Sequence, residues 1–350
     1  MELGKNGSMQ KSGSININTD SQIQTPNYLK MAWLRLIRWT NLLIIFLTQL
    51  LAWWCVILPM ARYSNEPLLL HTGNFLLLAM STVFIAAAGY IINDYFDIKI
   101  DAINRPEKVV LEKRIPRRMA ILSHTALNIL ALFMAGIVAK QAGHYEWLLV
   151  QLSCTILLWF YSTHFKRRFM TGNVVVALLT ALTIITLIIY EPAMHRYISL
   201  PSFGETSLSY LRPNPVWVLG IYAYFAFVLT WMREIVKDME DFKGDAEEGC
   251  ITMPIKWGLL RTVRFTQILG IFAVIPLVFA ALSLCLSGWL PFGLYTAIAL
   301  VAPIIAWIIF LPGTATTEHY SKASSRLKII MVLGVGSLLI YFFQAWIRSF

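Results

Sequence analysis

Long apolar segments separated by short polar connections run along the chain from about residue 34 to its end. A membrane-spanning helix needs about 20 mainly apolar residues. Nine segments meet this requirement: 34–60, 74–96, 118–140, 146–163, 173–191, 214–235, 263–285, 289–311 and 326–347. The pattern predicts an all-α membrane protein with nine transmembrane helices, in which residues 31–350 form one membrane domain. Residues 1–30 are polar and lack the apolar core of a signal peptide, so we expect a disordered cytoplasmic tail.

The composition excludes an ordinary soluble domain. Of the 350 residues, 57% are hydrophobic and 14% are charged, whereas soluble chains carry about 25% charged residues. The net charge of +10 could suggest nucleic-acid binding, but the Lys and Arg residues cluster in the short connections between apolar segments, as membrane topology requires. No nucleic-acid partner is therefore expected. The four cysteines are dispersed and indicate neither a disulfide framework nor a zinc site.

The basic residues also predict the orientation in the membrane. They are concentrated in the connections that follow the second, fourth, sixth and eighth apolar segments. Connections rich in Lys and Arg stay in the cytoplasm, so we expect the amino terminus to be cytoplasmic. In a bacterium the protein would lie in the plasma (inner) membrane.

Two acidic motifs stand at the predicted cytoplasmic ends of the second and sixth apolar segments. The first, N-D-Y-F-D-I-K-I-D, places Asp94, Asp97 and Asp101 at i, i+3 and i+7, which on a helix is one face. The second, D-M-E-D-F-K-G-D, repeats this spacing with Asp238, Asp241 and Asp245. Four helices separate the motifs, which predicts two four-helix halves plus a ninth helix. One acidic cluster at a helix end is commonly a solvated face, but two with matching spacing in so apolar a chain favour a functional site.

Six converging carboxylates would repel one another unless cations lay between them. Mg²⁺ suits such a site because it prefers oxygen ligands and is bound by a few carboxylates, waters and substrate phosphates. The expected Mg²⁺ ligands are Asp94, Asp97, Asp238 and Asp241, with Asp101 and Asp245 completing the two faces. Basic residues lie close to the motifs in the sequence, at Arg105, Lys108, Lys166, Arg167, Arg168, Arg233 and Lys237.

Acidic residues that hold Mg²⁺ and basic residues that contact phosphate oxygens together make a diphosphate site. A diphosphate bound at the membrane surface, with its tail between apolar helices, indicates a prenyl diphosphate. Loss of pyrophosphate would leave carbocation character on the allylic carbon. Aromatic rings could stabilise that charge, and the apolar bundle would exclude water.

The two motifs, followed by Asn104-Arg105-Pro106 and by Thr252-Met253-Pro254-Ile255, resemble the signature motifs of the UbiA superfamily of intramembrane prenyltransferases. Arg38 and Asn41 are similar to the Arg-x-x-Asn element of this family. The segment Y-S-T-H-F-K, from Tyr161 to Lys166, followed by Gly172-Asn173, resembles its Tyr/Lys element. The resemblance covers most of the chain from about Leu34.

The resemblance implies a central cavity that opens laterally to the bilayer and is capped by the two acidic motifs. It implies that Asn93 and the six aspartates hold Mg²⁺ and pyrophosphate, that Lys166 and Arg105 contact phosphate, and that Asn41 and Tyr161 line the cavity. The other residues expected to bind substrate are Arg38, Lys108, Arg233 and Lys237. The implied partners are a prenyl diphosphate donor, a lipid or aromatic acceptor and the bilayer.

The identity of the acceptor stays open at this point. The second motif is most similar to the branch of the family that alkylates prenylglyceryl phosphates, such as geranylgeranylglyceryl phosphate, but branches that prenylate homogentisate, 4-hydroxybenzoate or dihydroxynaphthoate have similar motifs. The family often continues Asn-Arg-Pro with a basic residue, Pro and a Gly-containing turn, whereas this chain continues with residues 107–112, E-K-V-V-L-E. A carrier that uses the acidic clusters for cation or proton coupling is the alternative from another class. A carrier would more commonly place its carboxylates in the middle of broken helices.

Overall fold

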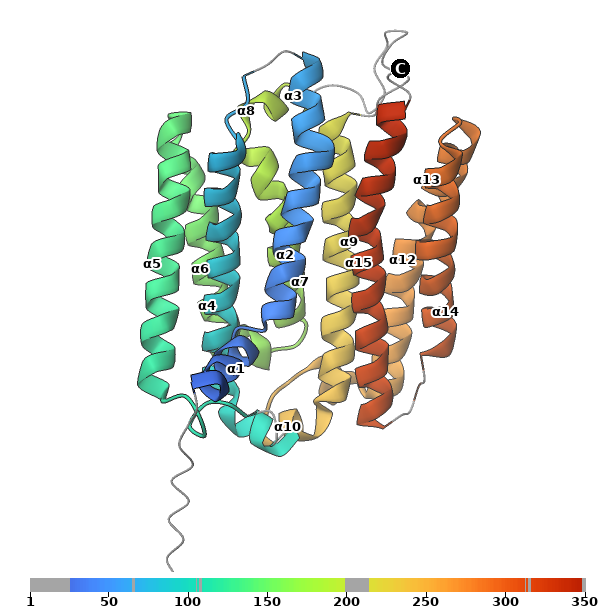
Figure 1. Ribbon diagram of the computed structural model, residues 1–350. Coiled ribbons are helices and arrows are strands. Elements are labelled where there is room, and N and C mark those ends of the chain that lie inside the picture. Colours follow the sequence, from blue (N-terminus) through green and yellow to red (C-terminus); the bar gives the residue numbers. More distant parts are fainter. Residues whose placement is uncertain are drawn as a thin grey trace, which may run out of the picture.

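The apolar segments predicted to cross the membrane are helices that stand side by side in one bundle (Figure 1). The computed structural model describes residues 26–64, 67–104, 106, 109–198, 214–311, 313 and 316–347. Within these ranges there is no β-strand, and the only extended pairing is an isolated bridge between Leu111 and Ile115. The predicted tail, residues 1–30, lies almost entirely outside the described residues.

The first half of the chain forms α1 (Pro26–Leu36), α2 (Trp39–Ala52), the π-helical turn η1 (Trp53–Ile57), α3 (Leu58–Ser64), α4 (Thr72–Asn104), α5 (Arg117–Ala142), η2 (Tyr145–Trp147), α6 (Leu148–Thr163), η3 (Phe165–Arg167), α7 (Thr171–Ile189) and α8 (Pro192–His195). The second half forms α9 (Pro215–Glu240), α10 (Phe242–Glu247), α11 (Met253–Trp257), α12 (Leu259–Leu286), α13 (Leu290–Tyr295), η5 (Thr296–Val301), α14 (Ala302–Phe310) and α15 (Thr317–Ile347).

Eight of the described helical segments are long and apolar enough to cross a membrane. This confirms an all-helical, multi-pass membrane protein. The remaining predicted span, 146–163, which is the fourth along the chain, corresponds to α6, which has 16 residues. At 1.5 Å per residue, α6 is about 24 Å long, shorter than the roughly 30 Å of a bilayer's hydrocarbon core. The count of nine therefore stays a prediction, as does the division into two halves.

Several boundaries differ from those that hydropathy predicts, among them the C-terminal ends of α4, at Asn104 rather than 96, and of α9, at Glu240 rather than 235. The first span was expected from residue 34, but the chain breaks at Arg38, whose φ of 51° and ψ of 53° are left-handed, and α2 begins at Trp39. The shorter α1 lies across the end of the bundle (Figure 1). The last helix begins at Thr317 rather than at 326, because polar turns precede its apolar part. These turns contain the Lys322–Glu318 ion pair, with 2.6 Å between Nζ and Oε1.

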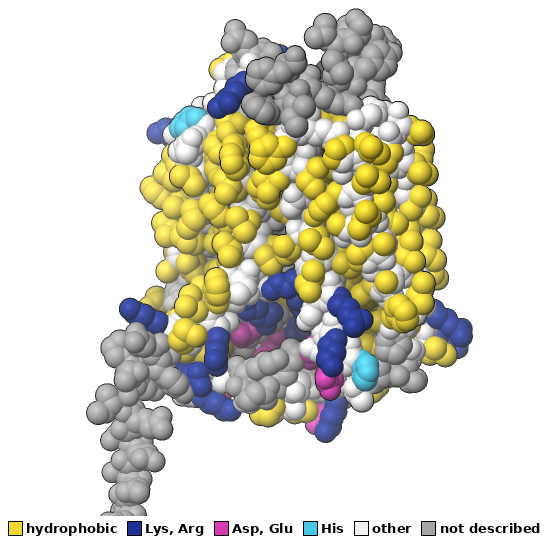
Figure 2. All heavy atoms as spheres, turned by 45° about the vertical axis from the view of Figure 1, so that its right-hand side comes forward, with side chains coloured by type: hydrophobic (Ala, Val, Ile, Leu, Met, Phe, Trp, Pro, Cys, Tyr) yellow, Lys and Arg dark blue, Asp and Glu magenta, His cyan; other side chains and the backbone are white. Residues whose placement is uncertain are grey.

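Helix packing brings the two ends of the chain together around α9. Helix α4 packs against α5 and α6, α7 packs against α9, and α15 packs against both α9 and α2. The outward surface carries exposed apolar side chains, including Phe279 and Leu286, and Figure 2 shows this apolar band around the molecule. Exposure of large apolar groups over such a band is what a lipid-facing surface requires.

The C-terminal ends of α4 and α9 lie at the end of the bundle that carries α1 and α10 (Figure 1). Basic side chains gather at this end, and acidic side chains are visible in a hollow between them (Figure 2). Both acidic motifs stand at this end of the bundle, at the C-terminal ends of α4 and α9. The packing of the helices therefore brings together two motifs that are more than 130 residues apart in the sequence.

Candidate functional site

The two acidic motifs are joined by direct hydrogen bonds between the end of α4 and the start of α10. The Gly244 N–H donates to Oδ1 of Asn104 at 3.0 Å, and Nδ2 of Asn104 donates to the main-chain carbonyl of Asp241 at 3.2 Å. A Cβ at position 244 would lie 2.5 Å from Nδ2 of Asn104. Only glycine therefore allows this approach without displacing Asn104.

The first motif lies on α4, as its spacing predicts, and two of its aspartates are held by cations. The carboxylate of Asp94 accepts a hydrogen bond of 2.7 Å from Nη2 of Arg38, whose guanidinium also lies over the ring of Tyr90. Asp97 is buried and accepts from Nδ2 of Asn93 at 2.6 Å and from the Lys166 ammonium. Charge-assisted donors of this kind make a buried carboxylate tolerable.

The second motif differs from the single helical face that its spacing predicts. Asp238 belongs to α9, Asp241 stands where α9 ends, and Asp245 belongs to the separate short helix α10. At this turn Asn104 binds main-chain groups on both sides, at Asp241 and Gly244. The carboxylate of Asp238 accepts a hydrogen bond of 2.8 Å from Nδ2 of Asn173, at the start of α7.

The pKa of the Asp245 carboxyl reflects the proximity of the two motifs. Burial raises the pKa of this carboxyl to about 7; the Lys166 ammonium lowers it, and the carboxylates of Asp241 and Asp97 raise it. Asp97 belongs to the first motif and Asp241 to the second. The two sets of acids therefore act on each other across the hollow.

Lys166 is positioned by the turn between α6 and α7. A Cβ at Gly172 would lie 2.9 Å from both Cα of Lys166 and the carbonyl of Phe165, so glycine lets α7 begin against this turn. Burial has the largest single effect on the pKa of the Lys166 ammonium and lowers it, but Asp97, Tyr161 and Asp241 together raise it by more, so the pKa stays above its usual value. Lys166 is therefore a permanent cation beside the first motif.

The oxygen donors fit Mg²⁺, although no preassembled set of three protein ligands is present. Among the described residues, no three Asp, Glu, His or Cys side chains lie close enough together to hold one metal ion. The site does offer carboxylates from both motifs, and Oδ1 of Asn93 is buried without a hydrogen-bond partner in the described part of the chain. Because Mg²⁺ is commonly bound by one or two carboxylates together with waters and substrate phosphates, this donor set fits an ion that arrives with a diphosphate.

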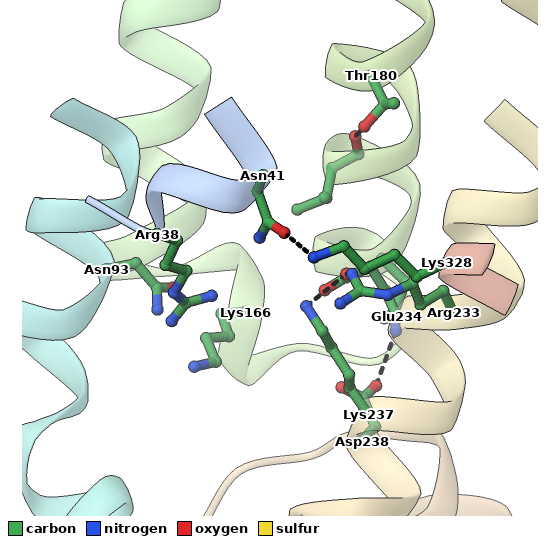
Figure 3. A network of polar contacts seen from close by, with 12 residues as sticks. Arg38, Asn41, Asn93, Lys166, Thr180, Arg233, Glu234, Lys237, Asp238 and Lys328 are labelled. Atoms are coloured by element: carbon green, nitrogen blue, oxygen red, sulfur yellow. Dashed lines mark hydrogen bonds and ion pairs between the residues drawn. The ribbon is translucent and has the colours of Figure 1, made fainter. Parts of the chain in front are cut away.

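Glu234 and Lys328 near the site were not found by sequence reasoning, whereas Asn173 belongs to the segment that resembles the Tyr/Lys element. Asn173 binds Asp238, Glu234 on α9 accepts from Lys237 and Arg233, and Lys328 on α15 donates to Oδ1 of Asn41 at 2.6 Å (Figure 3). A signal for Lys328 was present, because a lysine within an apolar span commonly marks a functional site.

The structure brings most of the predicted site residues to this end of the bundle. Tyr161, on the last turns of α6, lies within electrostatic range of Lys166 and of Asp97. Asp101 lies one turn beyond Asp97 on α4 and is partly buried. Arg105 and Lys108 lie outside the described residues.

Comparison with known proteins identifies the family. The model of the UbiA prenyltransferase family matches residues 50–330. Two curated relatives are digeranylgeranylglyceryl phosphate synthases: that of Methanosphaera stadtmanae is 30% identical over 275 residues, covering 77% of this chain and 87% of the relative. That of Methanothermobacter thermautotrophicus is 32% identical over 276 residues, covering 78% and 85% respectively.

Solved structures share the fold. A digeranylgeranylglyceryl phosphate synthase matches with a TM-score of 0.55 and 24% identity, over 91% of this chain and 98% of that structure. A UbiA homologue from Archaeoglobus fulgidus bound to GPP and Mg²⁺ matches with a TM-score of 0.52 and 15% identity, over 88% of this chain and 99% of that structure. At these identities the structural similarity supports the fold alone.

Proposed function

This chain belongs to the UbiA prenyltransferase family, and we propose that it transfers a polyprenyl group from a prenyl diphosphate to a prenylglyceryl phosphate with the help of Mg²⁺. The observation that carries this proposal is the meeting of the two acidic motifs with Lys166 and Arg38 at one end of an apolar bundle. Carboxylates for a divalent cation and cations for phosphate oxygens stand together beside a membrane-embedded interior. A prenyl diphosphate has matching chemistry, with a polar diphosphate and an apolar tail.

The proposed reaction forms an ether. The bond between the allylic carbon of the donor and the diphosphate oxygen breaks, and the diphosphate leaves with the electron pair. The hydroxyl oxygen of the acceptor forms a bond to that carbon and releases its proton. The products are a prenyl ether, diphosphate and one proton.

The residues of the chain supply binding and electrostatic stabilisation. Mg²⁺, held by Asp94, Asp97, Asp238 and Asp241, would offset the charge that develops on the departing diphosphate. Lys166 can donate to phosphate oxygens from its position beside Asp97, with Arg38 beside Asp94. We assign Arg105 and Lys108 to the same diphosphate, and Asp101, Asp245 and Asn93 to the oxygen ligands around it.

The relatives favour a glyceryl phosphate as the acceptor. The curated relatives named above are synthases of digeranylgeranylglyceryl phosphate. Glycerol has three oxygens, so a product with one phosphate and two prenyl groups arises from an acceptor with one phosphate, one prenyl group and one free hydroxyl. We propose the same class of acceptor for this chain, with Asn41 and Tyr161 lining the cavity in which it meets the donor.

We also propose that the end carrying α10 faces the cytoplasm. Basic side chains gather at this end (Figure 2), and Lys and Arg are enriched in cytoplasmic connections. Diphosphate released there would enter the aqueous phase.

The test uses the purified protein in lipid, labelled geranylgeranyl diphosphate and four acceptors: geranylgeranylglyceryl phosphate, 1,4-dihydroxy-2-naphthoate, 4-hydroxybenzoate and homogentisate. We expect product with the glyceryl phosphate in the presence of Mg²⁺ and none after chelation. Asp94→Asn and Asp238→Asn should both abolish it. Product with an aromatic acceptor alone would correct the acceptor class, and failure of the diphosphate to bind with Mg²⁺ present would favour a carrier.

A further inference from the structure

A second group of positive charge lies beside the proposed diphosphate site. It consists of Arg233 and Lys237 on α9 and Lys328 on α15, which we call the basic cluster. Their charged ends gather near Asn41 of α2 (Figure 3), and Arg233 is within electrostatic range of both lysines. Three cations from two distant parts of the chain therefore share one small volume.

The basic cluster has more positive charge than its protein partners balance. Glu234 accepts hydrogen bonds from Lys237 at 2.7 Å and from Arg233 at 3.2 Å, and it is the carboxylate to which both are paired. Lys328 makes no ion pair with any described residue, and its hydrogen bond is to the neutral amide of Asn41. Among the residues that the structure describes, one carboxylate thus offsets three cations, whereas Arg38 and Lys166 each have an aspartate of their own.

A guanidinium donor in the basic cluster is also unused. Nε of Arg233 is buried and has no hydrogen-bond partner within the described part of the chain. A buried charged donor without an acceptor is costly. The side chains of Arg233 and Lys237 nevertheless remain 20% and 26% exposed, so an incoming anion can reach them.

Two members of the basic cluster, Arg233 and Lys328, lie deeper in the bundle than the aspartates of the second motif. Arg233 precedes Asp238 by five residues on α9, which is about 8 Å along the helix axis. Lys328 stands eleven residues inside α15, about 16 Å from its start. A cation that only needed water would extend toward the nearest helix end, but Lys328 extends across the bundle toward Asn41 (Figure 3).

We infer that the basic cluster of Arg233, Lys237 and Lys328 binds the phosphate group of the acceptor. The inference rests on the proposed function and assigns residues to its second substrate. In a glyceryl phosphate with a free hydroxyl, only a few covalent bonds separate the phosphate from that hydroxyl. A phosphate held by the basic cluster would therefore keep the hydroxyl close to the allylic carbon of a donor whose diphosphate is bound at the aspartates.

The position of Lys328 gives it a further part in this arrangement. It connects α15 to Asn41 on α2, and Arg38 stands three residues before Asn41 at the diphosphate site. Lys328 therefore stands between the proposed acceptor phosphate and the diphosphate site. A phosphate dianion of the acceptor would bind directly to its ammonium. The phosphate would also supply the acceptor that Nε of Arg233 lacks.

The test measures the KM of each substrate separately in Lys328→Gln, with Lys328→Arg as the conservative variant. The acceptors are geranylgeranylglyceryl phosphate and the same lipid without phosphate, geranylgeranylglycerol. Lys322→Gln is the matched control, because Lys322 lies on the same helix but is exposed and paired with Glu318. Thermal stabilisation by donor and Mg²⁺ shows that each variant is folded and binds the diphosphate.

We expect Lys328→Gln to raise the KM for the phosphorylated acceptor by about 10- to 100-fold, since a charged hydrogen bond is lost. The KM for the donor should change by less than about threefold. The preference for the phosphorylated over the unphosphorylated acceptor should fall by a similar factor, about 10- to 100-fold, in Lys328→Gln. Lys328→Arg should retain most of this preference. An unchanged acceptor KM, or an equal rise for the donor, would overturn the inference while leaving the proposed function in place. A wild-type protein that uses no prenylglyceryl phosphate would refute the proposed acceptor, and the inference with it.

Discussion

The main-chain N–H of Gly244 donates a 3.0 Å hydrogen bond to the side-chain oxygen of Asn104, and this bond joins the ends of the two acidic motifs. The same amide side chain donates to the carbonyl of Asp241. Asn104 therefore determines the distance between the carboxylates of α4 and those of α9 and α10. It acts as a positioning residue, because it holds together groups that we propose bind Mg²⁺ and diphosphate.

Replacement of Gly244 by alanine should disrupt this arrangement. The new Cβ would lie 2.5 Å from Nδ2 of Asn104, so the amide must move and lose both hydrogen bonds. We expect Gly244→Ala to raise the Mg²⁺ concentration needed for half-maximal activity by about tenfold, as loss of one or two hydrogen bonds implies. The control is Gly220→Ala on α9, where a Cβ meets nothing within 4 Å. Equal Mg²⁺ dependence in both variants would contradict the role of Asn104.

Lys166 should be needed for turnover. Its ammonium is paired with the buried carboxylate of Asp97 and is proposed to contact the departing diphosphate. We expect Lys166→Gln to lower kcat by about 100-fold or more, since removal of one preorganised donor to a developing anion has effects of this size. Steady-state kinetics at saturating donor measure this change. The control is Lys99→Gln, at an exposed position near the C-terminal end of α4. Its kcat should stay within about twofold of the wild-type value. A loss of kcat comparable to that of Lys166→Gln would indicate a general charge effect.

Much of the fold could be predicted from hydropathy, because each span contains enough consecutive apolar residues to be recognised in the sequence alone. The break at Arg38 could not, since neither glycine nor proline stands there; in the folded chain α1 contacts α2 and α4, and the Arg38 side chain is paired with Asp94. The extended α15 was missed because its first turns are polar. The span predicted at 146–163 is only two residues longer than α6, because the 3₁₀ turn η2 precedes the helix.

The candidate site shows the same division between local and tertiary information. The spacing of Asp94, Asp97 and Asp101 predicted their common face because one continuous helix carries them. The turn at Asp241 follows from contacts with Asn104, a residue far away in the sequence. The place of Lys328 follows from the packing of the last helix against α2. Such contacts have no periodic signal in the sequence.

Glu191 should contribute to stability at the opposite end of the bundle. Its carboxylate is fully buried and accepts hydrogen bonds from the main-chain N–H groups of Leu70, at 2.8 Å, and Ala193, at 3.2 Å. Glu191→Ala would leave these buried donors unpaired, which should lower the free energy of unfolding by about 2–4 kcal/mol. Thermal unfolding in lipid measures the loss. Since Glu191 is remote from the aspartates, kcat per folded molecule should be unchanged, and a selective loss of kcat would contradict a purely structural role.

Mg²⁺ binding should weaken as the pH falls below neutrality, because burial raises the pKa of Asp245 to about 7. Above this pH the carboxylate is ionised and available to a cation; below it, Mg²⁺ must displace a proton. If Asp245 alone governs the change, the apparent Kd for Mg²⁺ with bound donor should rise by up to about tenfold per pH unit between pH 7 and 5. Calorimetry in buffers of different ionisation enthalpy should show proton release near pH 6. Asp245→Asn should bind Mg²⁺ more weakly at pH 8 but remove most of this pH dependence. An unchanged dependence in the variant would assign the titration to another carboxylate.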